Sequence, residues 1–306
     1  MRRLRLPFLA CVCAALVLAA CGSSSDPPAE TQAAAPASAT ATATNVGTAA
    51  SAGPDQASPA CAAGAAAPPS KVTGAPLDTI LRVPPRARGH RAPLIVALHF
   101  ASGTGSQMEQ ATRYTPQARR SGFVVAYPTA SANGFWSIDG DLAKLTATLD
   151  RIERIACIDP ARVYVSGISN GGFMATVVAC RMAGRIAAAA LFAPGMNGIG
   201  PCSPSRPPSV LEVHGTSDPI VPYAGVASFV GGWARRDGCA SRATATRRSA
   251  LVTLFRWPGC RGGAQVEHLR LTRGKHIELL PQLRQAGVDP AATAWSFLRA
   301  HRLPAA

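Results

Sequence analysis

Lysine and acidic residues are scarce in this chain of 306 residues. The 31 Lys and Arg residues outnumber the 16 Asp and Glu residues and give a net charge of +15. Only Lys71, Lys144 and Lys275 are lysines. The arginines are scattered, never form a run longer than a pair, and have no interleaved aromatic residues. A basic balance can indicate a nucleic-acid partner, but that function needs a patch or stripe of charge, so we expect no nucleic-acid binding.

Long apolar runs are also missing, apart from one near the start of the chain. Arg2, Arg3 and Arg5 precede an apolar run over residues 6–20, which is too short for a permanent membrane span. The run ends in Leu-Ala-Ala before Cys21, similar to a bacterial lipoprotein signal that is cut before a lipidated cysteine. The sequence therefore predicts a signal peptide over residues 1–20 and a lipid on Cys21. The alternative is an ordinary signal peptide with a chance cysteine.

Large apolar side chains are almost absent between residues 21 and 75, where Ala, Ser, Thr and Pro dominate. Such a segment buries too little surface to offset its conformational entropy, so we expect a flexible linker there. Residues 76–306 contain the apolar runs and are predicted to form one folded domain. The whole chain has 47% hydrophobic and 15% charged residues, which excludes a chain that is disordered throughout.

The sequence contains no Cys-x-x-Cys pair, which argues against a structural zinc site or a thioredoxin-like redox site. Beyond the predicted signal and Cys21, an even number of cysteines remains, which indicates disulfides in an exported protein. The sequence leaves their pairing open. They are Cys61, Cys157, Cys180, Cys202, Cys239 and Cys260.

Strand and helix patterns alternate through the domain. Short apolar runs predict strands at residues 94–98, 123–127, 162–167, 188–193, 210–214 and 266–271. Helical patterns lie between them at residues 106–120, 139–156, 171–183, 224–236 and 290–301. Strands separated by helices predict an α/β fold with a mostly parallel sheet and helices on both faces. In such sheets, reactive groups gather in the loops at the carboxyl ends of the strands.

The most specific motif is Gly167-Ile-Ser169-Asn-Gly171, which matches G-x-S-x-G. It lies between a predicted strand and a predicted helix, where this motif forms a sharp turn that exposes the serine hydroxyl. Glycine on either side lets the strand and the helix pack closely. Against a chance pentapeptide or a plain glycine-rich turn, this position favours Ser169 as a nucleophile.

A nucleophilic serine needs an acid and a histidine, which follow it in that order in α/β-hydrolases. Asp218 lies in the loop after the strand at 210–214, and we choose it as the acid, although aspartate before proline is also a common turn former. Asp237 and Asp289 have the positions of helix caps, and Glu212 lies within a strand.

The histidine is harder to choose, because several follow Ser169. His301 is in the terminal tail, and His214 precedes the acid. His268 lies within a predicted strand, whereas His276 follows that strand in a loop after Gly274. We choose His276 as the base, with His268 as the second choice. A structural histidine is the alternative for either.

An oxyanion intermediate needs two backbone N–H donors. One is expected from Asn170, the residue after the nucleophile. The other is expected from the loop after the strand at 94–98, where we choose Ala101. An ordinary βα loop is the alternative.

Two segments carry a family resemblance. Residues 158–172 (IDPARVYVSGISNGG) and 214–223 (HGTSDPIVPY) are similar to motifs of the secreted poly(3-hydroxybutyrate) depolymerase-like esterases, which include feruloyl and acetylxylan esterases. The resemblance implies an α/β-hydrolase fold and places Asp218 in the family's acid-bearing loop. It also implies a Cys239–Cys260 disulfide, because the family has a Gly-Cys after a Trp-containing helix and a later cysteine before its last core strand.

The chain departs from that family at two positions. The family's oxyanion loop usually begins His-Gly, whereas this chain has His99-Phe100. The family's histidine usually follows a glycine run and precedes Trp-Pro, whereas His276 follows Arg273-Gly-Lys and precedes Ile277-Glu. Phe100 is expected to reshape the acyl pocket or the geometry of the oxyanion donors, and the changed surroundings of His276 are expected to alter the substrate contacts nearby.

The sequence thus predicts a monomeric serine esterase that acts on a small ester or oligoester with a short hydroxyacyl, feruloyl or acetyl group. It needs no metal or organic cofactor. We expect export, either as a lipoprotein whose only membrane contact is the lipid, or as a secreted protein. The alternatives are a non-catalytic binding lipoprotein that retains the fold, and an acyltransferase with the same three residues.

Overall fold

The structure is a computed structural model that describes residues 59–62, 65–131, 133–196 and 199–305. The predicted signal peptide at 1–20, Cys21 and the linker up to residue 58 lie outside the described residues.

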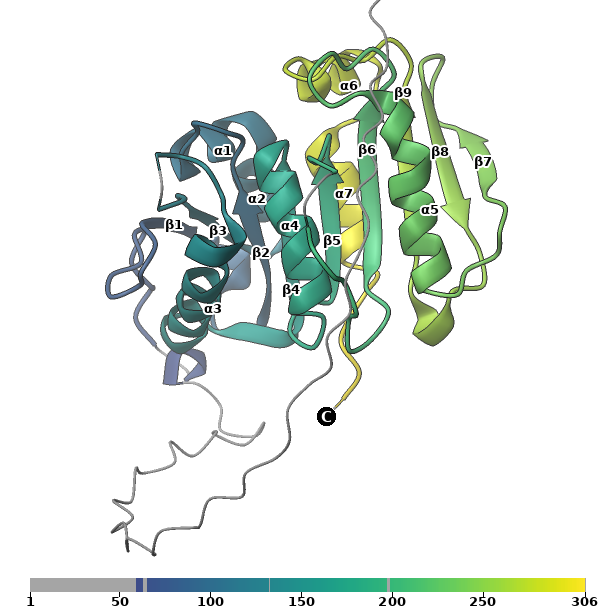
Figure 1. Ribbon diagram of the computed structural model, residues 1–306. Helices are drawn as coiled ribbons and strands as arrows, with labels where there is room; N and C mark the ends of the chain where they lie inside the picture. The colour runs from purple at the N-terminus through teal and green to yellow at the C-terminus, as the bar shows by residue number, and fades with distance from the viewer. Residues whose placement is uncertain (1–58, 63–64, 132, 197–198, 306) are drawn as a thin grey trace, which may run out of the picture. The chain divides into compact units, whose positions relative to one another are not determined.

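One sheet of nine strands runs through the described part of the chain, in the order β1-β3-β2-β4-β5-β6-β9-β8-β7 (Figure 1). The strands from β3 to β9 in that order are parallel, and β1, β8 and β7 extend the two edges in antiparallel pairing. The bounds are β1 Thr79–Arg82, β2 Ala92–Leu98, β3 Val124–Pro128, β4 Ile158–Ile168, β5 Ala188–Phe192, β6 Ser209–Gly215, β7 Thr244–Arg247, β8 Val252–Trp257 and β9 Val266–Leu271.

The six predicted strands are all present, as β2, β3, β4, β5, β6 and β9. The edge strands were not predicted. All four residues of β7 are exposed, and β1 is only four residues long. Neither therefore has the continuous apolar run that marks a strand buried on both faces.

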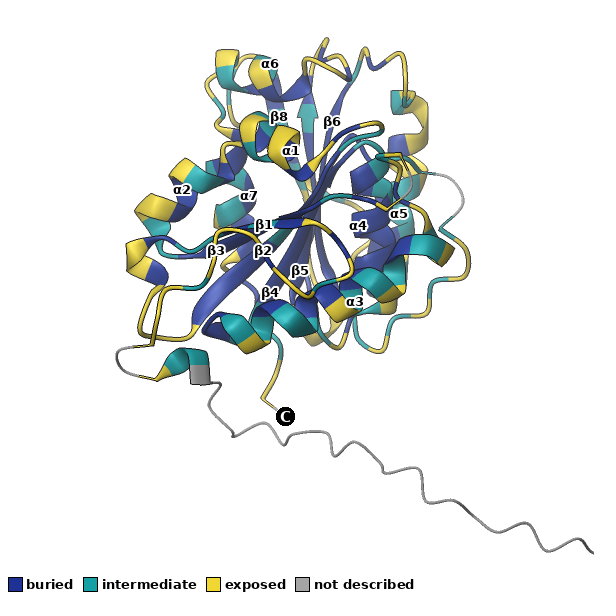
Figure 2. Cartoon of the chain, turned by 90° about the vertical axis from the view of Figure 1, so that its left-hand side faces the viewer, coloured by how far each residue is buried: buried dark blue, intermediate teal, exposed yellow. Residues whose placement is uncertain are grey.

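Helices cover both faces of the sheet, and the strands between them are buried (Figure 2). One apolar core lies between the sheet and α3, α4 and α5, and the other between the sheet and α1, α2, α6 and α7. The helix bounds are α1 Gly105–Thr112, α2 Tyr114–Ser121, α3 Ile138–Ile155, α4 Asn170–Arg181, α5 Val226–Arg236, α6 Leu279–Gln285 and α7 Pro290–Leu298.

The predicted helix at 106–120 is divided into α1 and α2. Arg113, between the two helices, has the left-handed backbone angle φ 58°. Pro116 explains the break, because a proline has no N–H for the helix and its ring clashes with the carbonyl four residues earlier. Pro116 is tolerated because it lies in the first turn of α2.

Short polar side chains start several helices. The side chains of Thr104, Ser137 and Asp289 accept hydrogen bonds from backbone N–H groups in the first turns of α1, α3 and α7. Such caps satisfy donors that have no partner within the helix. The prediction that Asp289 is a helix cap is confirmed.

The folded part extends to the N-terminal side of residue 76, the predicted start of the domain. Val72 is buried in the core, and its N–H donates to the carbonyl of Thr79. Further upstream, Cys61 forms a disulfide with Cys157. Residues 59–75 were expected in the linker on composition alone, which does not reveal a covalent attachment.

Two further disulfides join Cys180 to Cys202 and Cys239 to Cys260. The second of these is the pair that the family resemblance implies. With Cys61–Cys157, they account for all six cysteines beyond the predicted signal and Cys21. Three disulfides are typical of proteins that fold outside the reducing cytosol, and they indicate export.

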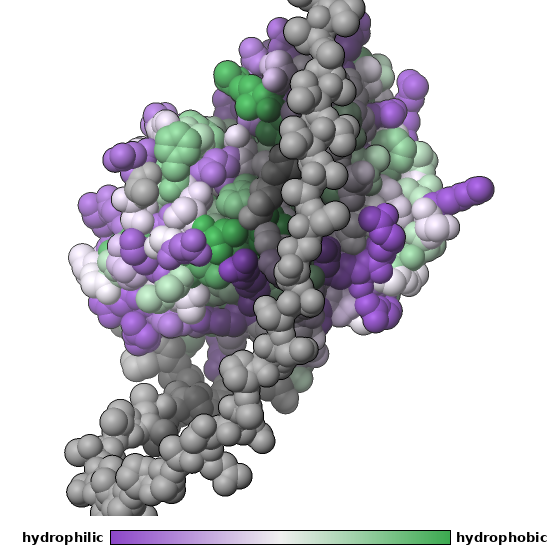
Figure 3. All heavy atoms as spheres, in the orientation of Figure 1, coloured by the Kyte–Doolittle hydropathy of each residue, from purple (hydrophilic) through white to green (hydrophobic). Residues whose placement is uncertain are grey.

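None of the helices in the described ranges combines the length and apolarity needed to cross a bilayer. The face seen in Figure 3 carries small hydrophobic areas among hydrophilic ones rather than one continuous apolar surface. The large hydrophobic side chains that are exposed in the described part are Phe135, Ile220 and Ile277.

Candidate active site

Ser169 lies in the turn between β4 and α4. Its backbone angles are φ 54° and ψ −117°. This combination is energetically unfavourable for any residue that has a side chain. Its N–H donates to the carbonyl of Phe192 in the next strand, which helps to hold the turn. The turn therefore has the strained geometry that the motif predicts.

The glycines of the motif are required by space. A Cβ atom on Gly171 would overlap the carbonyl oxygens of Leu98 and His99. A Cβ atom on Gly167 would overlap the carbonyl of Gly171. The start of α4 thus packs directly against the end of β2 and the loop that follows it.

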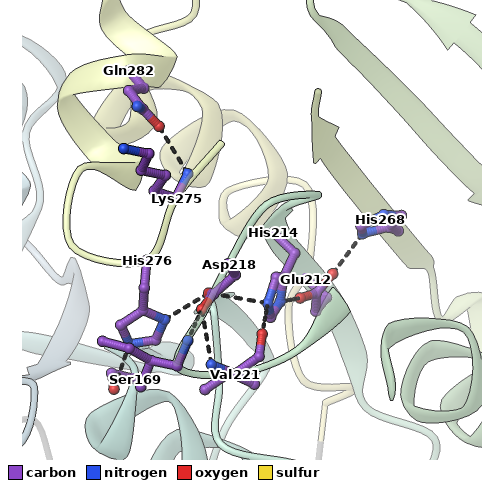
Figure 4. Close-up of polar contacts among 10 residues, drawn as sticks. Ser169, Glu212, His214, Asp218, Val221, His268, Lys275, His276 and Gln282 are labelled. Carbon is purple, nitrogen blue, oxygen red and sulfur yellow. Dashed lines mark hydrogen bonds and ion pairs between the residues drawn. The ribbon is translucent and has the colours of Figure 1, made fainter. Parts of the chain in front are cut away.

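Three side chains that are far apart in the sequence meet at the carboxyl edge of the sheet (Figure 4). Nε2 of His276 lies 2.8 Å from Oγ of Ser169, and Nδ1 of His276 lies 2.6 Å from Oδ2 of Asp218. Asp218 lies in the loop after β6, and His276 in the loop after β9. The three residues chosen from the sequence as nucleophile, base and acid are therefore hydrogen-bonded in that order.

The carboxylate of Asp218 is held rigidly. Its Oδ1 accepts from the backbone N–H groups of Ile220 at 2.9 Å and Val221 at 2.8 Å. These bonds leave Oδ2 to face His276. The side chain is fully buried, so water does not compete for the carboxylate.

The other histidines considered from the sequence lie elsewhere. His268, the second choice as base, contacts Glu212 and Tyr223 rather than Ser169. His301 contacts Ser209, and burial lowers its pKa to about 4. His214 lies behind Asp218, 3.3 Å from Oδ2.

Asp237, which the sequence predicted to be a cap, is the C-cap residue of α5 through its backbone N–H. Its side chain is buried, and neither carboxylate oxygen has a hydrogen-bond partner. Burial raises its pKa to about 7.

The loop after β2 is organised by His99. The N–H of Ala130 donates to Nε2 of His99 at 3.0 Å, so Nε2 carries no proton and Nδ1–H donates to the carbonyl of Phe100 at 2.7 Å. Burial lowers the pKa of His99, in agreement with a neutral ring. The N–H of Gly103 also donates to the Phe100 carbonyl.

These bonds fix the direction of the Ala101 N–H. In a trans peptide the carbonyl of one residue and the N–H of the next point in opposite directions. Because the Phe100 carbonyl points at His99 and Gly103, the N–H of Ala101 points away from them. The loop adopts this backbone arrangement although Phe100 has a bulky side chain.

Asn170 is the first residue of α4, so its N–H has no acceptor within the helix. Its side chain is fixed by Trp136, whose backbone N–H donates to Oδ1 at 2.7 Å. The indole Nε1 of Trp136 donates to the carbonyl of His99 at 2.9 Å. Trp136 thus joins Asn170 to the loop of Ala101.

A cavity of about 550 Å³ opens at Ser169. No charged side chain contributes to its lining, and the walls are largely apolar. The lining residues are Ser169, Asn170, Phe173, Gly195, Met196, Ile220, Val221, Pro222 and Gly225. The site can therefore accept an uncharged group next to a nucleophile that has a base in hydrogen-bond reach.

No sequence pattern indicated a role for His99, Trp136, Glu212 or His214. One signal was available for the last two. Residues two apart on a strand point to the same face, so Glu212 and His214 had to lie side by side on β6. The roles of His99 and Trp136 depend on contacts between distant loops and left no periodic signal.

In the described part of the chain, no group of three or more His, Cys, Asp or Glu side chains is arranged to hold a metal ion.

Comparison with known proteins extends these observations. The family described as "Esterase PHB depolymerase" matches residues 77–228. A bifunctional acetylxylan esterase/xylanase of Neocallimastix patriciarum is 31% identical over 195 residues, which are 60% of this chain and 29% of the relative. Feruloyl esterase B of Piromyces equi is 28% identical over 254 residues, which are 74% of this chain and 45% of the relative. The chain thus spans less than half of the length of either relative.

Solved structures resemble the fold. An acetyl xylan esterase from Aspergillus awamori superimposes with a TM-score of 0.57 at 16% identity, over 72% of this chain and 98% of that one. An esterase from the archaeon Pyrobaculum calidifontis superimposes with a TM-score of 0.51 at 16% identity, over 74% of this chain and 82% of that one. The predicted α/β-hydrolase fold is confirmed.

Proposed function

Through residues 77–228 this chain belongs to the Esterase PHB depolymerase family, and on that premise we propose that it hydrolyses carboxylic esters with Ser169 as the nucleophile. The observation that carries the proposal is the hydrogen-bonded line from Ser169 through His276 to Asp218, beside an uncharged cavity. This arrangement is that of a serine hydrolase.

In the proposed reaction, His276 Nε2 removes the proton of Ser169 while Oγ attacks the ester carbonyl. Asp218 keeps the Nδ1 proton of His276 in place and stabilises the imidazolium that forms. The tetrahedral intermediate collapses, His276 returns the proton to the leaving alcohol, and an acyl-enzyme remains. Water, deprotonated by His276, then releases the acid and regenerates the serine.

The developing oxyanion is proposed to bind the backbone N–H groups of Asn170 and Ala101. The free N–H at the start of α4 and the direction of the Ala101 N–H support this assignment. The positive end of the α4 dipole lies at the same point. Fixed donors of this kind stabilise a transition state because they need no reorganisation during the reaction.

The substrate class is proposed to be esters with a short hydroxyacyl, feruloyl or acetyl group. The names of the relatives point to acetylxylan and feruloyl esters. The cavity at Ser169 has no charged side chain to pair with a charged acyl group. Exposed Ile220 and Ile277 lie beside Asp218 and His276 in the sequence, which favours substrates with an apolar part.

We also propose that residues 1–20 are a signal peptide, that Cys21 carries a lipid, and that residues 21–58 link the lipid to a monomeric catalytic domain. Metabolic labelling with a radioactive fatty acid tests the anchor. Label in the wild type and none in Cys21→Ala is the expected result. Label in both proteins, or in neither, would contradict the anchor without affecting the proposed catalysis.

A panel of p-nitrophenyl esters, methyl ferulate and hydroxybutyrate oligomers tests the enzymatic function. Turnover of at least one class by the wild type and none by Ser169→Ala is expected. Binding without turnover would favour a tethered binding protein instead. Product formed on an added alcohol at the expense of free acid would favour acyl transfer.

A further inference from the structure

Behind Asp218, on the side away from Ser169, lies a line of buried polar side chains that the proposed reaction does not use (Figure 4). His214 Nδ1 lies 2.8 Å from Oε1 of Glu212, and His268 Nδ1 lies 2.5 Å from Oε2 of the same carboxylate. His268 Nε2 is 2.9 Å from the hydroxyl of Tyr223. The side chains of Glu212 and His214 are fully buried.

The ring of His214 has an acceptor at each nitrogen. Nδ1 faces the carboxylate of Glu212. Nε2 lies 2.9 Å from the carbonyl of Val221 and 3.3 Å from Oδ2 of Asp218. A carbonyl cannot donate, and Asp218 is acting as an acceptor for His276, so Nε2 must carry a proton. The contact between Nδ1 and Oε1 of Glu212 needs one more proton. On Nδ1 that proton makes the ring an imidazolium paired with ionised Glu212, and the Asp218 carboxylate near Nε2 favours this charged form.

His268 does not need a second proton. Its Nδ1–H can donate to Glu212 while its Nε2 accepts from the Tyr223 hydroxyl, which is able to donate. The neutral form therefore satisfies both ring nitrogens of His268. The two histidines on Glu212 thus differ in their second partners, and only His214 has an acceptor at both nitrogens that cannot donate in return.

Titration behaviour agrees with this assignment. Burial opposes the charged form of His214, but its hydrogen bond to Glu212 and the charge of that carboxylate outweigh burial, and its pKa is raised. Burial also opposes the charged form of Glu212, but the positive charge of the neighbouring histidines and the hydrogen bonds from His214 and His268 outweigh burial, and the pKa of Glu212 is lowered. Both shifts favour the ion pair.

Other charged and titratable groups face the cluster from each neighbouring element. Arg270 is paired with His214 in the register of β6 and β9, and its guanidinium stacks on Phe255. Tyr223 comes from the segment before α5, and its ring lies edge-on to His214. On the side of Ser169 the neighbours are Asp218 and His276.

The geometry points to His214 as a buried imidazolium that positions Asp218 and cancels the charge of Glu212. The inference rests on the proposed function, because the consequence concerns His276 as the base. With His214 charged, the charge of Glu212 is offset in the field at His276. Without the His214 charge that field becomes more negative, so His276 would hold a proton more tightly and be a poorer base at neutral pH.

The acidic limb of kcat/KM against pH measures the proton affinity of His276 in the free enzyme. In the full-length chain, His214→Gln keeps an N–H donor but removes the charge. In this variant we expect the acidic limb to shift to higher pH by roughly one pH unit, which is the size expected from the Coulomb energy between His276 and a nearby buried charge. We also expect kcat to fall roughly tenfold with KM little changed, since Asp218 loses a charged donor.

Two matched variants separate the effect of the His214 charge from a general structural effect of substitution in this cluster. Glu212→Gln/His214→Gln removes both charges of the pair and should return the limb close to that of the wild type. His268→Gln alters the other histidine on Glu212, which does not reach Asp218, and should leave the limb unchanged. A limb that stays in place in His214→Gln, or that moves equally in His268→Gln, would overturn the inference.

The side-chain ¹⁵N shifts of the wild type test the charge state without any variant having to fold. At about pH 7, above the ordinary pKa of a histidine, both nitrogens of His214 should have imidazolium shifts. A neutral His214 at that pH would overturn the inference. If the wild type hydrolyses no ester, the proposed function fails, but the ¹⁵N shifts still report the charge of His214, so the two failures are distinguishable.

Discussion

His276 Nε2 lies 2.8 Å from Ser169 Oγ, although 107 positions separate the two residues in the chain. The sheet makes this contact possible, because β4 and β9 are parallel and both end at the same edge. Ser169 follows β4 directly, and His276 follows β9 after a short turn at Gly274.

Strain at Ser169 predicts a gain in stability when the side chain is removed. Glycine accepts the φ of 54° without cost, whereas alanine retains the Cβ atom that causes the strain. We expect the free energy of unfolding of Ser169→Gly to be about 1 kcal/mol higher than that of Ser169→Ala. Urea denaturation of both variants measures the difference. A glycine variant that is less stable than the alanine variant would contradict a strained turn.

The role of His99 predicts a loss of turnover without a loss of binding. His99→Leu removes one of the two donors that hold the Phe100 carbonyl and leaves only the Gly103 N–H, so the Ala101 N–H is less firmly directed. We expect kcat to fall about 10²-fold while KM changes little, the size seen when one oxyanion donor is removed. Steady-state kinetics measure both. His90→Leu, at an exposed histidine, is the control and should keep the wild-type kcat.

The buried carboxyl of Asp237 predicts that Asp237→Asn stabilises the protein more at high pH than at low pH. Burial raises its pKa to about 7 in the folded state, against about 3.9 when unfolded. The unfolded chain therefore releases its proton first as the pH rises, and the wild type loses stability between about pH 4 and 7. The loss is bounded by about 4 kcal/mol.

Urea unfolding at about pH 5 and pH 8 checks this sign. The advantage of Asp237→Asn should grow with pH. The matched control is Asp289→Asn, because Asp289 is an exposed helix cap and asparagine caps equally well. An advantage of Asp237→Asn that is the same at both pH values would mean that Asp237 does not titrate as a buried acid.

Loop lengths predict which disulfide stabilises most. Cys61 and Cys157 are separated by 96 positions, and Cys180 and Cys202 by 22. A cross-link that closes a longer loop restricts the unfolded chain more, by about 1 kcal/mol for these two lengths. The double serine variant at 61 and 157 should therefore have the lower free energy of unfolding. Equal destabilisation by both double variants would contradict this entropic ranking.

The central strands and the three residues of the candidate active site were predictable from the sequence. Apolar runs identified the six central strands, and the serine motif between a strand and a helix identified Ser169. Once those strands were placed at a common edge, Asp218 and His276 followed from the order of residues along the chain. The first two inferences use information that is local in the sequence, and the third uses the order of residues along the chain.

What was missed depends on contacts that only the fold creates. β7 is exposed along its whole length, so no apolar pattern marked it. Trp136 joins Asn170 to the His99 carbonyl across two loops. The charge of His214 depends on Val221 and Asp218, which reach it only when the loop after β6 folds back. The disulfide at Cys61 likewise attached a segment whose composition predicted a linker.

Reaction with a fluorophosphonate followed by intact-mass and peptide mapping tests the central claim most directly. The account predicts one adduct per chain, on Ser169, in the wild type. It also predicts no adduct in Ser169→Ala, and slow labelling in His276→Gln, because the serine would lose its base. Equal labelling of wild type and Ser169→Ala, or no labelling of a folded wild type, would contradict the claim that Ser169 is an activated nucleophile.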